Sequence, residues 1–242
     1  MKNHKCLIDK EYLILPIIWF FSILIRGYKY GVSNHISYVL PYIYKIQDSS
    51  LYQKDFTFDY AVENSFFFNI IGKISSHVDL QIIMFMLYLI FSFLFILAIY
   101  KITHLLFENK YISYIAILLL ITTKPTLGTD QTFRMITLPI TIAIPILLFA
   151  LYYFLKNKFI PAFLLLGIAF NIHGLSSAYI LATFLFSLIL KFKNINKKRF
   201  FLGLLIFIIS IVPLFIQANE TTQLSFFNAD EGWLSLIKSI DK

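Results

Sequence analysis

The chain has 242 residues, of which 59% are hydrophobic and 14% are charged, and its formal net charge at pH 7 is +8. Globular domains carry about 25% charged residues, so this composition excludes an ordinary soluble enzyme and predicts a polytopic membrane protein. The positive charge does not indicate nucleic-acid binding, because the lysines stand at the ends of apolar runs, where they set the orientation of membrane segments. The one cysteine, Cys6, excludes an intrachain disulfide bond.

The first apolar segment, residues 12–30, ends in Arg26-Gly27-Tyr28-Lys29. No small-residue cleavage pattern follows it, so we expect an uncleaved membrane anchor rather than a signal peptide. Residues 31–80 then form a long polar segment, which we expect to lie outside the membrane.

This outside segment contains two amphipathic stretches. From Val62 to Ile74, apolar residues recur at helical spacing while polar residues occupy the other face. The Phe-rich face predicts a helix that lies on the bilayer surface. A shorter stretch from Tyr38 to Tyr44, around Pro41, carries tyrosines typical of the membrane interface.

The apolar segments together predict a helical bundle. Lysines are denser in the connections that lie inside when the N-terminus is inside, so we expect that orientation, with the tail 218–242 outside. We find no linker and no internal repeat, and we therefore expect residues 1–242 to form a single all-α transmembrane module with short, broken helices. Besides 12–30, the segments are 81–103, 111–123, 135–155, the pair 160–172 and 174–190, and 201–217.

The pair of segments between Ile160 and Leu190 is the most informative feature, because it has no formal charge yet carries Asn171, His173 and Gly174 near its middle. A straight helix over these residues would be about 46 Å long at 1.5 Å per residue, whereas the hydrocarbon layer is about 30 Å thick. We therefore predict a hairpin broken at 171–174. Non-helical backbone at membrane depth is tolerated only beside protein or a wet cavity, so the break is a candidate functional site.

No motif of a soluble enzyme is present, and the candidate chemistry lies in polar residues on the predicted outer side. Asp55 and Asp59 could serve as a general base or as carboxylates that hold a divalent cation, or they are solvated loop acids or helix caps. Arg134 could hold a phosphate, or it anchors its segment at the interface with Asp130 as an i,i+4 partner. The full set is Asn34, His35, Asp48, Asp55, Asp59, Glu63, Asp130, Arg134, Asn171 and His173.

His173 has two interpretations as well. A polar side chain at the break of an apolar hairpin is costly unless it faces protein or water. In the structural interpretation it bonds the arms of the hairpin through Ser176 or Asn171. In the functional one it acts on a phosphate or carries a proton.

The order of these residues resembles the N-terminal half of bacterial multi-pass proteins with the C-type glycosyltransferase (GT-C) fold, such as oligosaccharyltransferases and lipid-linked mannosyltransferases. The likeness is carried by Asn34-His35, the stretch from Asp48 to Asp55, Arg134 at the head of a span, and Ile172-His173-Gly174. It implies a sugar donor on a polyprenyl phosphate and an active site that faces away from the cytoplasm, at the bilayer of the cytoplasmic membrane. By this likeness Asp55 matches the loop carboxylate, with Asp48 second. Arg134 would grip the donor phosphate, His173 would assist, and Asn34, His35 and Asp59 would support the site.

Two alternatives stay open. Phe133-Arg134 and the stretch from Phe170 to Ala178 also resemble O-antigen and exopolysaccharide polymerases, in which an Arg and a His face a polyprenyl-diphosphate glycan. A different class is a non-enzymatic transporter or scaffold piece, because broken helices with polar centres also mark transporters. An inverted repeat would favour a transporter, and the sequence shows none.

Overall fold

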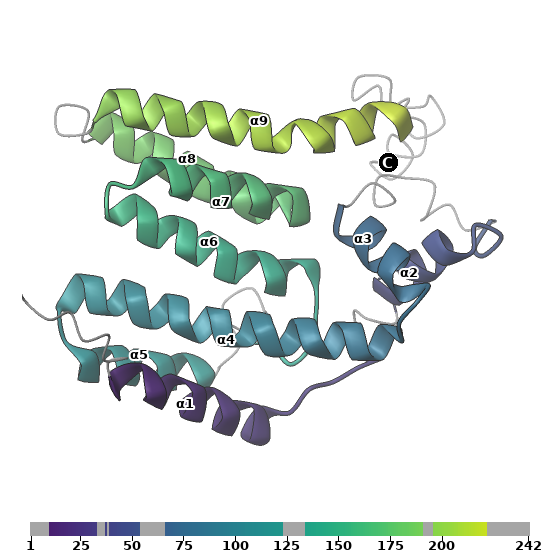
Figure 1. The fold of residues 1–242 in the computed structure, drawn as a ribbon, viewed down its shortest axis with the longest axis horizontal. Helices are drawn as coiled ribbons and strands as arrows, with labels where there is room; N and C mark the ends of the chain where they lie inside the picture. Colours follow the sequence, from purple (N-terminus) through teal and green to yellow (C-terminus); the bar gives the residue numbers. More distant parts are fainter. Residues whose placement is uncertain are drawn as a thin grey trace, which may run out of the picture.

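The computed structural model describes residues 10–32, 37, 39–53, 66–122, 134–190 and 196–221, and the regular secondary structure of these residues is helical. The predicted all-α class is therefore confirmed for this part of the chain, and each predicted apolar segment corresponds to a helix (Figure 1). The helices are α1 (Lys10–Arg26), α2 (Leu40–Gln47), α3 (Phe66–Ser75), α4 (Leu80–Phe107), α5 (Lys110–Ile121), α6 (Pro139–Leu155), α7 (Phe159–Ile172), α8 (Gly174–Leu190) and α9 (Lys197–Thr221).

Among the described helices, α4 is the one that is both long and apolar enough to cross a membrane by itself. Its 28 residues correspond to about 42 Å at 1.5 Å per residue. The apolar helices α1, α5, α6, α7 and α8 are shorter. The membrane-spanning bundle beyond α4 thus stays a prediction.

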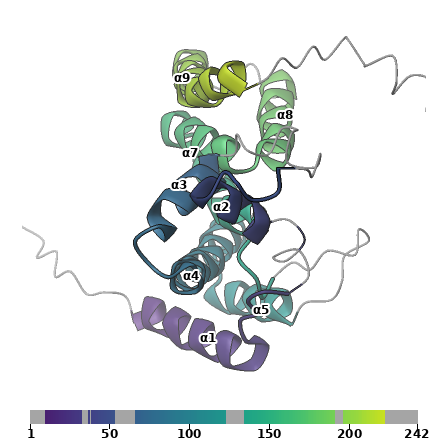
Figure 2. The same cartoon turned by 90° about the vertical axis from the view of Figure 1, so that its right-hand side faces the viewer.

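The long helices lie side by side, and α2 and α3 sit together next to one end of these helices (Figure 1). Viewed along the helix axes from that end, α8 lies to one side of the column formed by α9, α7 and α4 (Figure 2). Because consecutive helices reverse direction, the opposite end receives the connections after α4, α6 and α8. We call the two ends the α2/α3 end and the lysine-rich end. The latter carries Lys110, Lys156, Lys158, Lys197, Lys198 and Arg199.

This separation is the arrangement that the predicted orientation requires, since basic residues gather at the cytoplasmic side of membrane proteins. At the lysine-rich end, the ammonium groups of Lys101 and Lys156 lie 5.8 and 5.3 Å from the ring centroid of Tyr152. Such cation–π contacts help to keep the charges at the helix ends. Which end faces the cytoplasm stays a prediction.

The packing of α7 against α9 depends on two glycines. A Cβ atom on Gly203 would stand 2.7 Å from Cδ2 of Phe163 and 2.9 Å from the carbonyl oxygen of Phe159. A Cβ on Gly167 would collide with the side chain of Ser210. Small residues allow two helices to approach closely, and here they give α7 a fixed position next to α9.

Three buried clusters hold the bundle together. One joins α2, α3 and the start of α4 to Leu138 and Ile142 near the start of α6. A second, rich in phenylalanine, lies between α6, α7, α8 and α9, where the rings of Phe154 and Phe184 stack at 3.9 Å between centroids. The third joins α1, α4 and α5. The first cluster matters for function because Ile172, the last residue of α7, packs against it and so brings the hairpin break to the α2/α3 end.

The amphipathic helix predicted from residue 62 is present as α3 in its described part, but only some of its apolar residues can meet a bilayer. Phe67 and Ile71 are buried against the protein, so their predicted place on the membrane surface is wrong. Phe66, Ile70 and Ile74 are exposed and keep that prediction. The sequence periodicity identified an apolar face but could not show that α2 and α4 cover part of it.

Candidate functional site at the α2/α3 end

His173 forms the break between α7 and α8. Its N–H donates to the Ala169 carbonyl at 2.8 Å and closes α7, and its own carbonyl accepts from the Ser177 hydroxyl at 3.0 Å. Its Nδ1 accepts the backbone N–H of Ser176 at 3.3 Å. His173 therefore caps the N-terminus of α8 with a side-chain acceptor. The predicted break is confirmed, whereas the bond to Ser176 is a local cap of α8 and not the predicted bond between the two arms of the hairpin.

This bond determines what the imidazole can offer. A ring nitrogen that accepts a hydrogen bond carries no proton, so the proton of the neutral ring is assigned to Nε2. Burial lowers the pKa of His173, and the positive charge of Arg134 lowers it further. His173 is thus half-buried and neutral near pH 7, with Nε2–H as its remaining donor.

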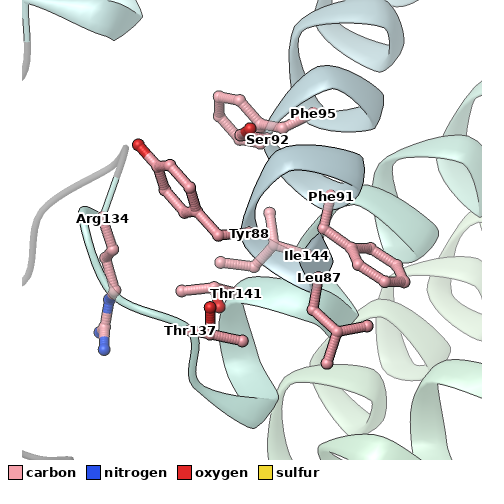
Figure 3. A pocket seen from close by; sticks show the side chains of 9 residues that line it. All are labelled: Leu87, Tyr88, Phe91, Ser92, Phe95, Arg134, Thr137, Thr141 and Ile144. Atoms are coloured by element: carbon pink, nitrogen blue, oxygen red, sulfur yellow. The ribbon is translucent and has the colours of Figure 1, made fainter. Parts of the chain in front are cut away.

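Arg134 lies in the segment that leads into α6, and its charge reaches His173 although the two residues are far apart in the sequence. It also lines a small cavity of about 40 Å³ beside α4. In Figure 3 the guanidinium group extends past Thr137 and away from Ser92 and Phe95, so it is directed out of the apolar part of this cavity. Arg134 and His173 are therefore two predicted site residues that the structure couples electrostatically.

Two hydrogen bonds fix the segment that carries Arg134. The Lys29 N–H donates to the Met135 carbonyl at 2.8 Å. The Thr137 hydroxyl donates to the Met84 carbonyl at 2.7 Å and is buried. These bonds tie the segment to the chain that follows α1 on one side and to α4 on the other, so the Arg134 backbone has a defined position.

Asp48 has a capping role in the structure. It follows α2, and its carboxylate accepts the Ser50 hydroxyl at 2.6 Å and the Ser50 backbone N–H at 2.9 Å. These two hydrogen bonds lower the pKa of the exposed Asp48 carboxyl. Within the described residues, no contact joins Asp48 to Arg134 or His173, so its predicted second-choice catalytic role has no support beyond the resemblance.

Six of the candidate residues lie outside the described residues, namely Asn34, His35, Asp55, Asp59, Glu63 and Asp130. Whether Asp55 meets Arg134 and His173 therefore stays a prediction. In the described ranges there is no group of three His, Cys, Asp or Glu side chains that could hold a metal ion. A divalent cation held by the loop carboxylates likewise stays a prediction.

Asn171 does not bond His173, so this alternative partner in the hairpin was wrong. Instead, its buried amide nitrogen donates to the carbonyls of Gly167 at 2.8 Å and Ser210 at 2.9 Å. The second bond connects α7 to α9. Asn171 is thus a structural link between helices, placed there by the close approach that Gly167 allows.

Arg26 is a candidate that the sequence interpretation missed. It ends α1, and both its Nε and Nη2 are buried without a hydrogen-bond partner. The hydroxyl of Tyr28 is buried close to Thr137 and also lacks a well-formed hydrogen bond. In the sequence, an arginine directly after an apolar run is typical of an interfacial anchor, so its burial could not be predicted.

No family model, curated protein or solved structure matches this chain. The likeness to GT-C proteins therefore rests on the quoted residues alone.

Proposed function

We propose that this protein transfers a sugar from a polyprenyl-phosphate-linked donor at the outer face of the cytoplasmic membrane. The observation that supports the proposal is the electrostatic coupling between Arg134 and His173, a cation and a neutral hydrogen-bond donor from two distant segments. They lie at the end of the bundle that carries α2 and α3, opposite the lysine-rich end.

In this reaction an acceptor hydroxyl attacks the anomeric carbon of the sugar and the lipid phosphate leaves. Negative charge grows on the phosphate as the glycosidic bond breaks. A guanidinium group forms charge-assisted, bidentate hydrogen bonds to phosphate, and it stabilises the transition state when it is already in place. Arg134 has this role in the proposal.

His173 serves as a hydrogen-bond donor and not as a base. Its Nδ1 is engaged with Ser176, and its depressed pKa favours the neutral ring. The Nε2–H can donate to an oxygen of the lipid-linked sugar and orient it without adding a second positive charge to that of Arg134. The base that takes the acceptor proton in this proposal is the loop carboxylate Asp55.

The test is transfer of label from a polyprenyl-phosphate-linked sugar by the full chain in membranes, with protein abundance measured in parallel. Loss of a positioned base costs about 10²–10⁴ in rate, and we expect a loss of this order for Asp55→Asn and for Arg134→Gln. Arg199→Gln is the matched control for Arg134→Gln, because Arg199 is exposed, and it should retain transfer.

Normal transfer by both single variants, Asp55→Asn and Arg134→Gln, would refute the proposed mechanism. A ladder of repeat units made from a diphosphate-linked glycan would instead identify a polymerase. If the unaltered chain transfers no sugar from either type of donor, the enzymatic proposal fails and a transport or scaffold role replaces it.

A further inference from the structure

The end of α1 carries a cation with two buried nitrogens that the roles of Arg134 and His173 do not explain. Arg26 is followed by Gly27, whose φ of +75° terminates the helix in the left-handed region that favours glycine. The guanidinium group turns into the protein, where Nε and Nη2 are buried and have no hydrogen-bond partner. An unsatisfied buried group that carries charge is costly, so these two donors indicate a missing anionic acceptor.

The surroundings of Arg26 suit an oxyanion. Its charge interacts with the Tyr88 hydroxyl, which itself donates to the Gly27 carbonyl at 3.1 Å. The Tyr28 ring lies 4.9 Å from that of Tyr88 and presents a second buried hydroxyl without a well-formed hydrogen bond. Tyr88 also lines the cavity shared with Arg134 (Figure 3). Two arginines therefore border the same tyrosine from different segments.

An apolar groove lies between α1 and α4, nearer the N-terminus of α1 than this cation. Its volume is about 350 Å³, and its lining is almost entirely apolar. The polar atom of Trp19, Nε1, donates to the Ser92 hydroxyl at 2.9 Å and is satisfied inside the protein. Because an apolar cavity has no partners for water, the groove suits a hydrocarbon chain. The groove is lined by Pro16, Trp19, Leu89, Ile90, Phe93 and Leu94.

The groove and the cation share one side of α1. Trp19 and Arg26 are seven residues apart, which is about two turns or 10.5 Å along a helix and returns to nearly the same face. On α4, Phe85, Leu89 and Phe93 follow each other at intervals of four residues. Phe85 contacts the Tyr28 ring at 5.3 Å between centroids, and Phe93 contacts Trp19 at 5.6 Å. One apolar ridge thus connects the groove to the unpartnered cation.

We propose that Arg26 binds the phosphate of a phosphorylated lipid whose hydrocarbon chain lies in the groove between α1 and α4. A cation with two free buried donors matches a phosphate in charge and geometry. The dry groove that begins about two turns away matches a chain attached to that phosphate. Free inorganic phosphate would use only the first feature, and a neutral lipid only the second.

The choice of a phosphorylated lipid as the ligand rests on the proposed function, but the test of this inference measures lipid binding and not sugar transfer. The probe is radiolabelled farnesyl phosphate, added to the full chain in phosphatidylcholine nanodiscs, with empty nanodiscs as background. We expect Arg26→Gln to weaken binding about ten- to a hundredfold, the loss typical of hydrogen bonds to a charged group. Lys29→Gln is the matched control, because Lys29 is an exposed cation three residues away, and it should leave affinity within about twofold.

The groove is tested separately by Leu89→Trp, which fills it. Loss of contact with about two methylene groups should weaken the binding of farnesyl phosphate about tenfold. A competition measurement on the unaltered chain does not depend on whether a variant folds. In it, unlabelled farnesyl phosphate should displace the probe far better than farnesol or inorganic phosphate does.

Equal competition by inorganic phosphate or by farnesol would overturn the proposal, as would unchanged binding by Arg26→Gln or an equal loss in Lys29→Gln. If Arg26→Gln loses binding while the unaltered chain transfers no sugar, only the proposed function fails. If the unaltered chain transfers sugar and Arg26→Gln binds normally, only this inference fails.

Discussion

The backbone N–H of Ser176 donates to Nδ1 of His173 at 3.3 Å, so one imidazole both caps α8 and keeps its other nitrogen free. A single side chain thereby combines a local structural role with a donor directed away from the helix end. The two roles are separable, because an asparagine side chain can replace the cap but not the position of Nε2.

The first prediction uses this separation. Asparagine is a strong N-cap residue and alanine is a poor one, and loss of a cap costs about 1 kcal/mol. We expect His173→Ala to lower the free energy of unfolding by about that amount and His173→Asn to stay near the unaltered protein. Unfolding in mixed micelles measures both variants. Equal stability of the alanine and asparagine variants would show that the Ser176 bond contributes nothing.

The second prediction concerns pH. His173 lies between α7 and α8, and its folded-state pKa is below the ordinary value of 6.5. The unfolded chain therefore binds this proton more readily, and stability falls as the pH drops below about 6.5. The unaltered protein should lose stability relative to His173→Asn between about pH 7.5 and pH 5, because only the imidazole titrates in that range. A gain in relative stability on acidification would contradict a folded-state pKa of His173 that is lowered by burial and by the charge of Arg134.

The third prediction tests the contact between α7 and α9. Gly203→Ala should destabilise the protein by about 1–3 kcal/mol, the usual cost of overpacking, because its Cβ would meet Phe163 and the Phe159 carbonyl. Gly174→Ala is the control, since its nearest neighbour would be Cε1 of Phe170 at an ordinary 3.7 Å. We expect that variant to stay within about 0.5 kcal/mol. If both alanines have the same effect in an unfolding titration, the close packing at Gly203 is not limiting.

The fourth prediction concerns orientation. In a Cys6→Ser background, a cysteine at Ser50 in the turn after α2 should react with an impermeant reagent in intact cells. A cysteine at Asn196, directly before α9 at the lysine-rich end, should react only after permeabilisation. Labelling at Asn196 from outside would exclude the predicted seven-segment orientation.

Several features followed from the sequence because their causes are local. Apolar runs of helical length, the amphipathic period of α3 and the polar break of the hairpin each depend on residues within a few turns of one another. The break could be placed at 171–174 because a continuous helix would exceed the membrane thickness, and the described structure has it at His173. Composition likewise determined the all-α class of the described residues.

Other features depended on which segments meet in space, and no local pattern contains that information. Asn171 and His173 looked equivalent as polar residues of one hairpin, yet Asn171 bonds α9 while His173 caps α8 and is affected by the charge of Arg134. Arg26 resembled a surface anchor in the sequence, yet the packed structure buries two of its nitrogens. Burial and electrostatic neighbours are properties of long-range packing, so the sequence alone determined the helices and their candidate polar residues, and only the tertiary structure decided which of those residues act together.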